Sequence, residues 1–251
     1  MLHNYHTHTK RCNHAQGEDR EYVENAVKNG LKTLGFSDHA PYLFPNTDYQ
    51  SSFRMKTDLL FEYAESVRSL AKEYEKDIRI LCGFELEYYP DFHAEEMAFL
   101  KQVSPDYLIM GQHVLNSELT KWISPRSNED WTLCMYVTEV LAGLATGDFL
   151  YLAHPDLSGY DYSEEVMQQE YRRLCEGAKR MHIPLELNFL GVRSNRHYPD
   201  RRFFKIAAEV GNDIVLGVDA HSPDIVFDPA SEQTARQWAD ELGFHIVEKL
   251  L

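Results

Sequence analysis

Short, almost uninterrupted apolar runs alternate with longer amphipathic stretches along the whole sequence, and this alternation limits the fold more than any other feature. Such runs are typical of parallel β-strands that are covered on both faces, because neither face meets water. The predicted strands are residues 2–6, 31–36, 78–85, 107–111, 149–153, 183–187 and 214–218. The predicted helices are residues 18–29, 56–74, 92–103, 128–146, 163–181, 201–210 and 230–242. The sequence therefore predicts an α/β protein.

Seven strand–helix repeats, with no second pattern, predict a single domain over residues 1–251. Polar residues follow almost every predicted strand, whereas an open doubly wound sheet needs them only near its switch point. The sequence therefore favours a closed, TIM-like barrel of seven or eight strands with its site at the C-terminal ends of the strands. Neither GxGxxG nor GxxxxGK(S/T) occurs, so no nucleotide cofactor is expected.

The chain is acidic, with 25 Lys and Arg against 40 Asp and Glu and a net charge of -15. It has no block of basic residues to neutralise a phosphate backbone, so no nucleic-acid partner is expected. The first residues are polar, so no signal peptide is expected. No apolar run approaches the length of a membrane span, so no contact with a membrane is expected. The four cysteines form no CxxC pair and are expected to be reduced thiols in a cytoplasmic protein. No feature of the sequence sets an oligomeric state.

Histidines and carboxylates follow the ends of the predicted strands, where histidines that only stabilise a fold have no reason to gather. The residues at these ends are His6, His8, His14, His39, Glu85, His113, His154, Asp219 and His221. Residues i and i+2 of a strand point to the same face, so His6 and His8 can act on one centre, and so can Asp219 and His221. Closing a barrel makes its first and last strands neighbours, which brings the two pairs together. The set of nitrogen and oxygen donors is too large for one ion and predicts two or three divalent cations, Zn, Mn or Fe.

The motifs that contain these residues also carry a family resemblance. In chain order they are His6-x-His8, His14, Ser37-Asp38-His39, Gly83-Phe84-Glu85, Gly111-Gln112-His113, Ala153-His154 and Asp219-x-His221. This series resembles the PHP (polymerase and histidinol phosphatase) superfamily over the whole chain. The segments GFSDHAP, GFELEYYP, GQHVL and GVDAHSP are most similar to its histidinol-phosphatase branch.

The resemblance implies a distorted (β/α)7 barrel with a trinuclear metal centre. It implies that one ion is held by His6, His8, Glu85 and Asp219, a second by His14, His39 and His221, and a third by His113, His154 and the bridging Glu85. Neighbouring cations lower the pKa of a bridging water, and the resulting hydroxide is expected to attack phosphorus in line.

The leaving alkoxide needs a proton, and a metal-bound water, Asp219 or Asp38 is expected to supply it. Asp38 has a second possible role, which is to orient a ligand histidine. Glu87 faces the same way as Glu85, so it either orients a ligand, binds a substrate amine or packs in the core.

Arginine is the side chain expected to hold the phosphate, because its guanidinium group can bind two phosphate oxygens at once. Arg193 follows the sixth predicted strand and matches a Gly-x-Arg of the phosphatase branch; Arg196 and His197 are further candidates. Related phosphatases often have a basic residue shortly after the strand-five His-x-Asp, whereas this chain reads His154-Pro155-Asp156-Leu157-Ser158-Gly159. Arg126 is a possible substitute for that residue.

Hydrolysis of a small phosphorylated substrate, L-histidinol phosphate in histidine biosynthesis, is the leading hypothesis for function. The alternatives are a phosphoesterase for a nucleotide, a sugar phosphate or phosphotyrosine, a nucleic-acid exonuclease, and a non-catalytic metal-binding protein. The acidic surface argues against the exonuclease, and the complete ligand set argues against the non-catalytic protein.

Overall fold

The computed structural model describes residues 1–119, 129–159 and 161–251. These residues form two compact units, which are described separately. Unit 1 contains residues 1–86, 91–109 and 217–229, and unit 2 contains residues 87–90, 110–216 and 230–251. Among the described helices, none is both long and apolar enough to cross a membrane.

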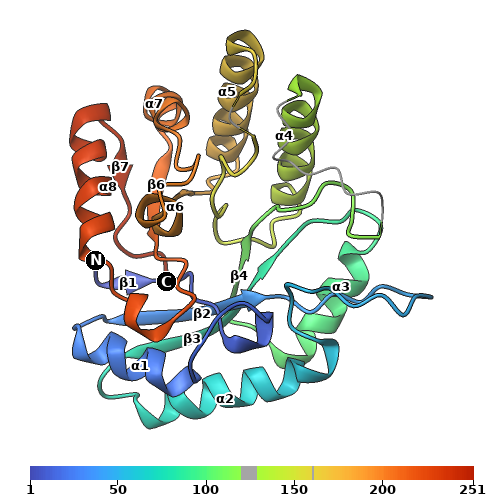
Figure 1. The fold of residues 1–251 in the computed structure, drawn as a ribbon, viewed down its shortest axis with the longest axis vertical. Helices are drawn as coiled ribbons and strands as arrows, with labels where there is room; N and C mark the ends of the chain where they lie inside the picture. The colour runs from blue at the N-terminus through green and yellow to red at the C-terminus, as the bar shows by residue number, and fades with distance from the viewer. Residues whose placement is uncertain (120–128, 160) are drawn as a thin grey trace. The chain divides into compact units, whose positions relative to one another are not determined.

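Unit 1 is built on a four-stranded sheet with the order β1-β2-β3-β4. Its strands are β1 (His3–Asn4), β2 (Thr33–His39), β3 (Arg79–Leu86) and β4 (Tyr107–Met110), whose last residue belongs to unit 2. The β1–β2 and β2–β3 pairs are parallel, and every residue of β2 is buried. The helices are α1 (Asp19–Lys28), α2 (Leu60–Glu73) and α3 (His93–Leu100), and Figure 1 shows α1 and α2 side by side along β2 and β3. Both expectations, buried strands and parallel pairing, are confirmed in this unit.

Tyr107 fixes the packing of this sheet. A side chain at Gly35 would place its Cβ 2.3 Å from the Tyr107 hydroxyl, and one at Gly83 would lie 2.5 Å from Cε1 of the same ring. The hydroxyl donates to the carbonyls of Tyr5 at 2.8 Å and Phe36 at 3.1 Å. The two glycines therefore leave the space in which a buried tyrosine joins neighbouring strands. Parallel register then places His39 opposite Glu85 at the C-terminal ends of β2 and β3.

The segment after β1 pairs with the segment after β6. Thr7 and Ala220 form a parallel bridge, in which His8 N donates to Ala220 O at 2.9 Å and Ala220 N donates to His6 O at 3.2 Å. The first and last of the predicted strands thus lie side by side at this point, as expected for residues 6–8 and 219–221.

Unit 2 contains a sheet with the order β5-β6-β7. Its strands are β5 (Leu185–Asn188), β6 (Asp213–Gly217), whose last residue belongs to unit 1, and β7 (His245–Ile246). Its helices are α4 (Asp130–Leu144), α5 (Glu164–Arg180), α6 (Phe189–Arg193), α7 (Arg201–Val210) and α8 (Pro229–Leu242), whose first residue belongs to unit 1. Helices α4, α5 and α7 pack against one another in sequence order (Figure 1). Gly211 ends α7 with a φ of +79°, a left-handed conformation in which glycine carries no Cβ penalty.

The structure corrects the predicted strand at residues 149–153. Only Leu152 pairs there, through isolated parallel bridges to Met110 and Leu185. The run ends two residues before Pro155, and the neighbouring Pro184 has no N–H to donate, so a regular ladder does not extend. Two short elements, α6 and β7, were not among the predicted ones. The α/β class with parallel pairing is confirmed, and these described strands do not by themselves form a regular seven-stranded ladder.

Candidate metal centre

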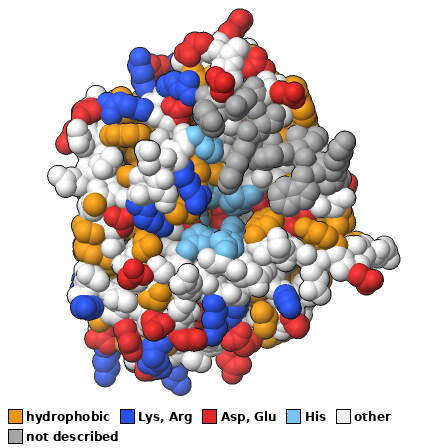
Figure 2. Space-filling view, in the orientation of Figure 1, with side chains coloured by type: hydrophobic (Ala, Val, Ile, Leu, Met, Phe, Trp, Pro, Cys, Tyr) orange, Lys and Arg blue, Asp and Glu red, His pale blue; other side chains and the backbone are white. Residues whose placement is uncertain are grey.

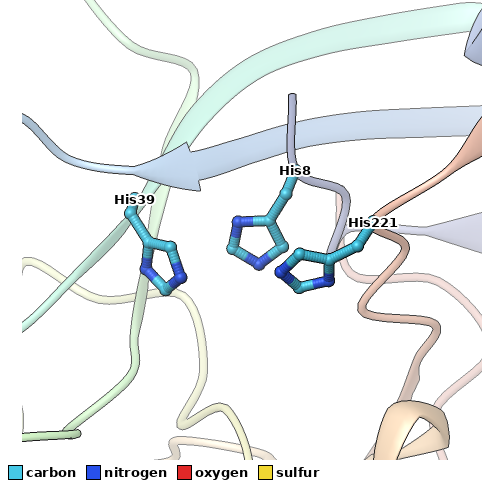
Figure 3. A group of neighbouring side chains, drawn as sticks. All are labelled: His8, His39 and His221. Carbon is cyan, nitrogen blue, oxygen red and sulfur yellow. The ribbon is translucent and has the colours of Figure 1, made fainter. Parts of the chain in front are cut away.

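Strand ends in unit 1 bring six of the predicted ligands together. His6 and His8 follow β1, His39 ends β2, Glu85 lies near the end of β3, and the last two, Asp219 and His221, follow β6. Figure 3 shows the rings of His8, His39 and His221 directed into a common space from three segments that are far apart in the sequence. One ring nitrogen from each of these three lies within 4.8 Å of the others.

The Glu85 carboxylate lies at the middle of this cluster. Its Oε2 is 3.0 Å from Nδ1 of His39, 3.5 Å from Nε2 of His8 and 3.6 Å from Nε2 of His6. The side chain is 1 % exposed. One carboxylate oxygen therefore faces three imidazoles, a donor arrangement that suits a cation.

Asp219 supplies the second carboxylate. Its Oδ1 is 3.2 Å from Nδ1 of His221, 3.3 Å from Nε2 of His8 and 3.8 Å from Nε2 of His6. The residue has a φ of +50°, a left-handed conformation that is uncommon for residues other than glycine. The turn of the backbone at this point lets a residue after the strand direct its carboxylate at the histidines after β1.

The histidine rings of the cluster lie close to one another. The ring centroid of His8 is 4.2 Å from that of His221, and the planes of these two rings are 24° apart. The ring centroid of His8 is also 4.4 Å from that of His39. His14 lies 4.8 Å from His221, and its Nδ1 hydrogen-bonds to the Cys12 carbonyl at 2.8 Å, which leaves Nε2 as the nitrogen able to ligate. His14 is exposed and His221 is partly so, and Figure 2 shows histidine side chains at the surface of the face that is drawn.

The cluster favours positive charge at its centre. Burial alone lowers the pKa of His8, but hydrogen bonds to Asp219 and Asp38 and the nearby Glu85 reverse this and raise it to about 9. Burial of Asp219 is likewise outweighed, by His6 and by hydrogen bonds from His221 and His8, so its pKa stays well below the ordinary value. Two buried carboxylates therefore create a place where a cation is stable.

Asp38 lies beneath the cluster and is fully buried. Its Oδ1 accepts a hydrogen bond from the His39 backbone N–H at 2.9 Å and is 3.5 Å from Nδ1 of His8, and its Oδ2 accepts one from the Thr9 hydroxyl. These contacts agree with the orienting role considered for Asp38, because they fix His8 with Nε2 directed at Glu85 and Asp219.

Cys12 is a residue that the sequence reasoning treated only as a structural thiol. Its sulfur forms a group with ring nitrogens of His14 and His221 in which the donor atoms are within 4.8 Å of one another. Burial, followed by the negative charge of Asp38, raises the pKa of this thiol. The spacing Cys12-x-His14 is a sequence signal for this proximity that the prediction did not use.

In unit 2, His113 and His154 are neighbours, with ring centroids 4.8 Å apart. Glu87, fully buried, is 3.0 Å from Nδ1 of His113 through Oε1, and its Oε2 accepts hydrogen bonds from the Tyr89 hydroxyl and from the Val114 N–H. Of the roles considered for Glu87, the contacts favour orienting a histidine.

The predicted phosphate-binding residues lie around α6 in unit 2. Arg193 is the last residue of α6 and is partly exposed. Arg196 is exposed and donates to the Tyr198 hydroxyl at 2.7 Å, and Nε2 of His197 hydrogen-bonds to the Leu157 carbonyl at 2.9 Å. Arg126 lies outside the described residues.

Comparison with known proteins identifies the family. Residues 4–189 match the PHP domain family, which is more than half of the chain. The chain belongs to the PHP-domain family. The predicted resemblance is therefore confirmed at the level of the family.

Several histidinol-phosphatases are similar to this PHP-domain protein. It is 28 % identical over 228 residues to a protein of Deinococcus radiodurans named probable histidinol-phosphatase, with 87 % of this chain and 85 % of the relative covered. It is 30 % identical to the histidinol-phosphatase of Bacillus subtilis over 118 residues, 45 % of this chain and 44 % of the relative. A crystal structure of histidinol phosphate phosphatase from Lactococcus lactis, complexed with Zn, L-histidinol and phosphate, has a TM-score of 0.74 at 20 % identity and covers 98 % of this chain and 95 % of that chain. That similarity supports the fold.

The donor set of this PHP domain fits divalent metal ions. The donors are imidazole nitrogens and carboxylate oxygens, the types that Zn, Mn and Fe accept. Glu85 and the Asp219 carboxylate are buried with several imidazoles around each, an arrangement in which a cation balances the negative charge.

Proposed function

We propose that this PHP-domain protein is a metal-dependent phosphomonoester hydrolase that converts L-histidinol phosphate and water into L-histidinol and phosphate. The observation that carries the proposal is the buried cluster in unit 1, where Glu85 and Asp219 are each surrounded by imidazoles. The similarity to histidinol-phosphatases over most of the chain supports the choice of substrate.

We assign the metal ligands as the sequence predicted them. In unit 1, His6, His8, Glu85 and Asp219 would hold one ion, and His14, His39 and His221 would hold a neighbouring one. In unit 2, His113 and His154 would contribute to a third, with Glu85 as the bridge. Bound ions of this kind, Zn, Mn or Fe, acidify water and neutralise phosphoryl oxygens. The proposal includes a (β/α)7 barrel that contains both units in one domain, and a cytoplasmic location.

The remaining steps fall to the side chains of the protein. Arg193 would hold two phosphoryl oxygens and stabilise the charge that develops on them. Despite burial, the neighbouring His6, with hydrogen bonds from His221 and His8, holds the pKa of Asp219 well below its ordinary value, which supports a role as a ligand rather than as a general acid. Asp38 is fully buried and hydrogen-bonded to Thr9 and His39, so its role is to orient. Water at the site would therefore protonate the leaving alkoxide.

The experiment is a measurement of kcat/KM on a panel of phosphomonoesters, including L-histidinol phosphate, a nucleotide, a sugar phosphate and p-nitrophenyl phosphate. Apoprotein is loaded separately with Mn, Zn or Fe, and the bound metal is measured by elemental analysis. A clear preference for L-histidinol phosphate, reduced in Arg193→Ala, is expected. If L-histidinol phosphate is no better than p-nitrophenyl phosphate, the substrate assignment is wrong. If metal-loaded protein hydrolyses none of them, the enzyme assignment is wrong.

A further inference from the structure

Asn4, which is not one of the predicted metal ligands, joins the two segments that present ligands in unit 1. It lies at the end of β1 and is 0 % exposed. A fully buried amide costs free energy unless its polar atoms are hydrogen-bonded, so the partners of its side chain show what it does.

Two backbone N–H groups converge on the amide oxygen of Asn4. His6 N donates to Oδ1 at 3.1 Å, and Val218 N, 214 positions away in the sequence, donates to it at 3.2 Å. The amide nitrogen donates to the Thr7 hydroxyl at 2.8 Å and to the His6 carbonyl at 3.3 Å. Because the two N–H donors fix which end of the amide is the oxygen, the orientation of the side chain is unambiguous.

These contacts hold Asp219 on both sides. Val218, the residue before it, is tied to Asn4, and Ala220, the residue after it, is tied to the His6 carbonyl at 3.2 Å and to His8 N at 2.9 Å. The residues on either side of Asp219, Val218 and Ala220, are thus each hydrogen-bonded to residues of β1 or of the segment after it, while Asp219 itself takes its left-handed φ of +50°. Such a conformation persists only where surrounding bonds over-determine it.

We infer that Asn4 is a positioning residue for the metal centre. It imposes the left-handed turn that directs Asp219 Oδ1 at Nε2 of His8, 3.3 Å away, and at Nδ1 of His221, 3.2 Å away. The amide acts before any ion binds, because it fixes two distant ligand segments relative to each other and lowers the conformational entropy that binding would otherwise cost. This inference rests on the metal centre of the proposed function.

The test compares Asn4→Ala with Asn212→Ala. Asn212 is a matched control, because it is also a buried asparagine, 2 % exposed, whose amide donates to a backbone carbonyl, that of Cys175, at 2.9 Å. It lies between α7 and β6 in unit 2, and no predicted ligand contacts its side chain among the hydrogen bonds of the described residues. Two quantities are measured for each protein: the Tm of the apoprotein, and the dissociation constant for Zn and Mn by competition with a chromogenic chelator.

Both variants are expected to have a lower apoprotein Tm, but only Asn4→Ala should lose metal affinity, by about 10- to 100-fold. Co²⁺-loaded Asn4→Ala should also have an altered visible d–d spectrum, since the ligand geometry changes. If Asn4→Ala does not fold, Asn4→Ser carries the same expectation, because its shorter side chain does not span to the Val218 N–H.

Wild-type affinity and an unchanged Co²⁺ spectrum in the folded Asn4 variant would overturn the inference, as would an equal loss of affinity in Asn212→Ala. A wild-type protein that binds metal but does not hydrolyse L-histidinol phosphate would refute the proposed function alone, since the comparison of metal affinities would still decide the role of Asn4.

Discussion

Replacing Arg11 with Met is expected to destabilise unit 1 more than most single substitutions. Arg11 lies in the short 3-10 helix Lys10–Cys12, between the ligand segments of His8 and His14. Its guanidinium binds both oxygens of Asp19 at 2.8 Å, and Nε and Nη2 donate to Glu62 at 2.8 and 2.9 Å. The side chains of Arg11 and Asp19 are 6 % and 5 % exposed, whereas Glu62 is 57 % exposed.

The magnitude follows from these exposures. Removing one partner of a buried ion pair leaves an uncompensated charge and costs about 3–5 kcal/mol. The pair with exposed Glu62 contributes only about 0–1 kcal/mol. Methionine retains much of the packing against the Tyr63 ring, which lies 5.5 Å from Cζ of Arg11, so the loss comes mainly from Asp19. After the substitution, Asp19 retains the Ser66 hydroxyl at 2.6 Å as a hydrogen-bond donor.

The assay is urea and thermal unfolding of the chelator-treated protein, so that metal binding does not contribute to stability. Arg11→Met should lower Tm by about 6–20 °C, since about 1 kcal/mol corresponds to about 2–4 °C in a chain of this size. Glu62→Gln, the control, should change Tm little. The double variant Arg11→Met/Asp19→Asn should regain part of the loss, because it removes the unpaired buried carboxylate. A cost below about 1 kcal/mol, or no recovery in the double variant, would refute the assignment of a buried, stabilising pair.

Three further predictions concern other buried contacts. Burial raises the pKa of Glu96 from 4.5 to about 8, so the folded state loses stability as pH rises from about 4.5 to 8. The free energy of unfolding of Glu96→Gln should equal that of the wild type at pH 4.5 and exceed it by a few kcal/mol at pH 8, at about 1.4 kcal/mol per pKa unit. Urea unfolding at both pH values measures this difference. Glu87→Gln should weaken metal retention or kcat/KM by about 10- to 100-fold with little change in Tm, because His113 loses the carboxylate that orients it. Unchanged metal retention together with unchanged kcat/KM would contradict that role. Gly191→Ala would place a Cβ 2.1 Å from the Tyr198 carbonyl oxygen and should cost about 1–3 kcal/mol in thermal unfolding, whereas a wild-type Tm would show that the backbone there yields freely.

Much of the candidate site could be predicted because strand periodicity is local. His6 and His8 share a face because they are two residues apart in extended backbone, and parallel strands end at the same edge of a sheet, which brings His39 opposite Glu85. The helical conformation of the long amphipathic segments was likewise predictable from the spacing of their apolar residues. The predicted strand at residues 149–153 failed because its pairing depends on the neighbours that tertiary structure supplies, and only Leu152 forms β-bridges to them.

The sequence by itself determined the α/β class, the placement of histidines and carboxylates at strand ends, and a donor set suited to divalent metal ions. Tertiary structure alone decided that Val218 donates to Asn4, that Asp219 adopts a left-handed backbone, and that the Cys12 sulfur lies beside His14 and His221. The physical reason is the range of the forces involved. Hydrophobic periodicity acts over a few neighbouring residues, whereas a buried amide or thiol acquires its partners only when distant segments pack together.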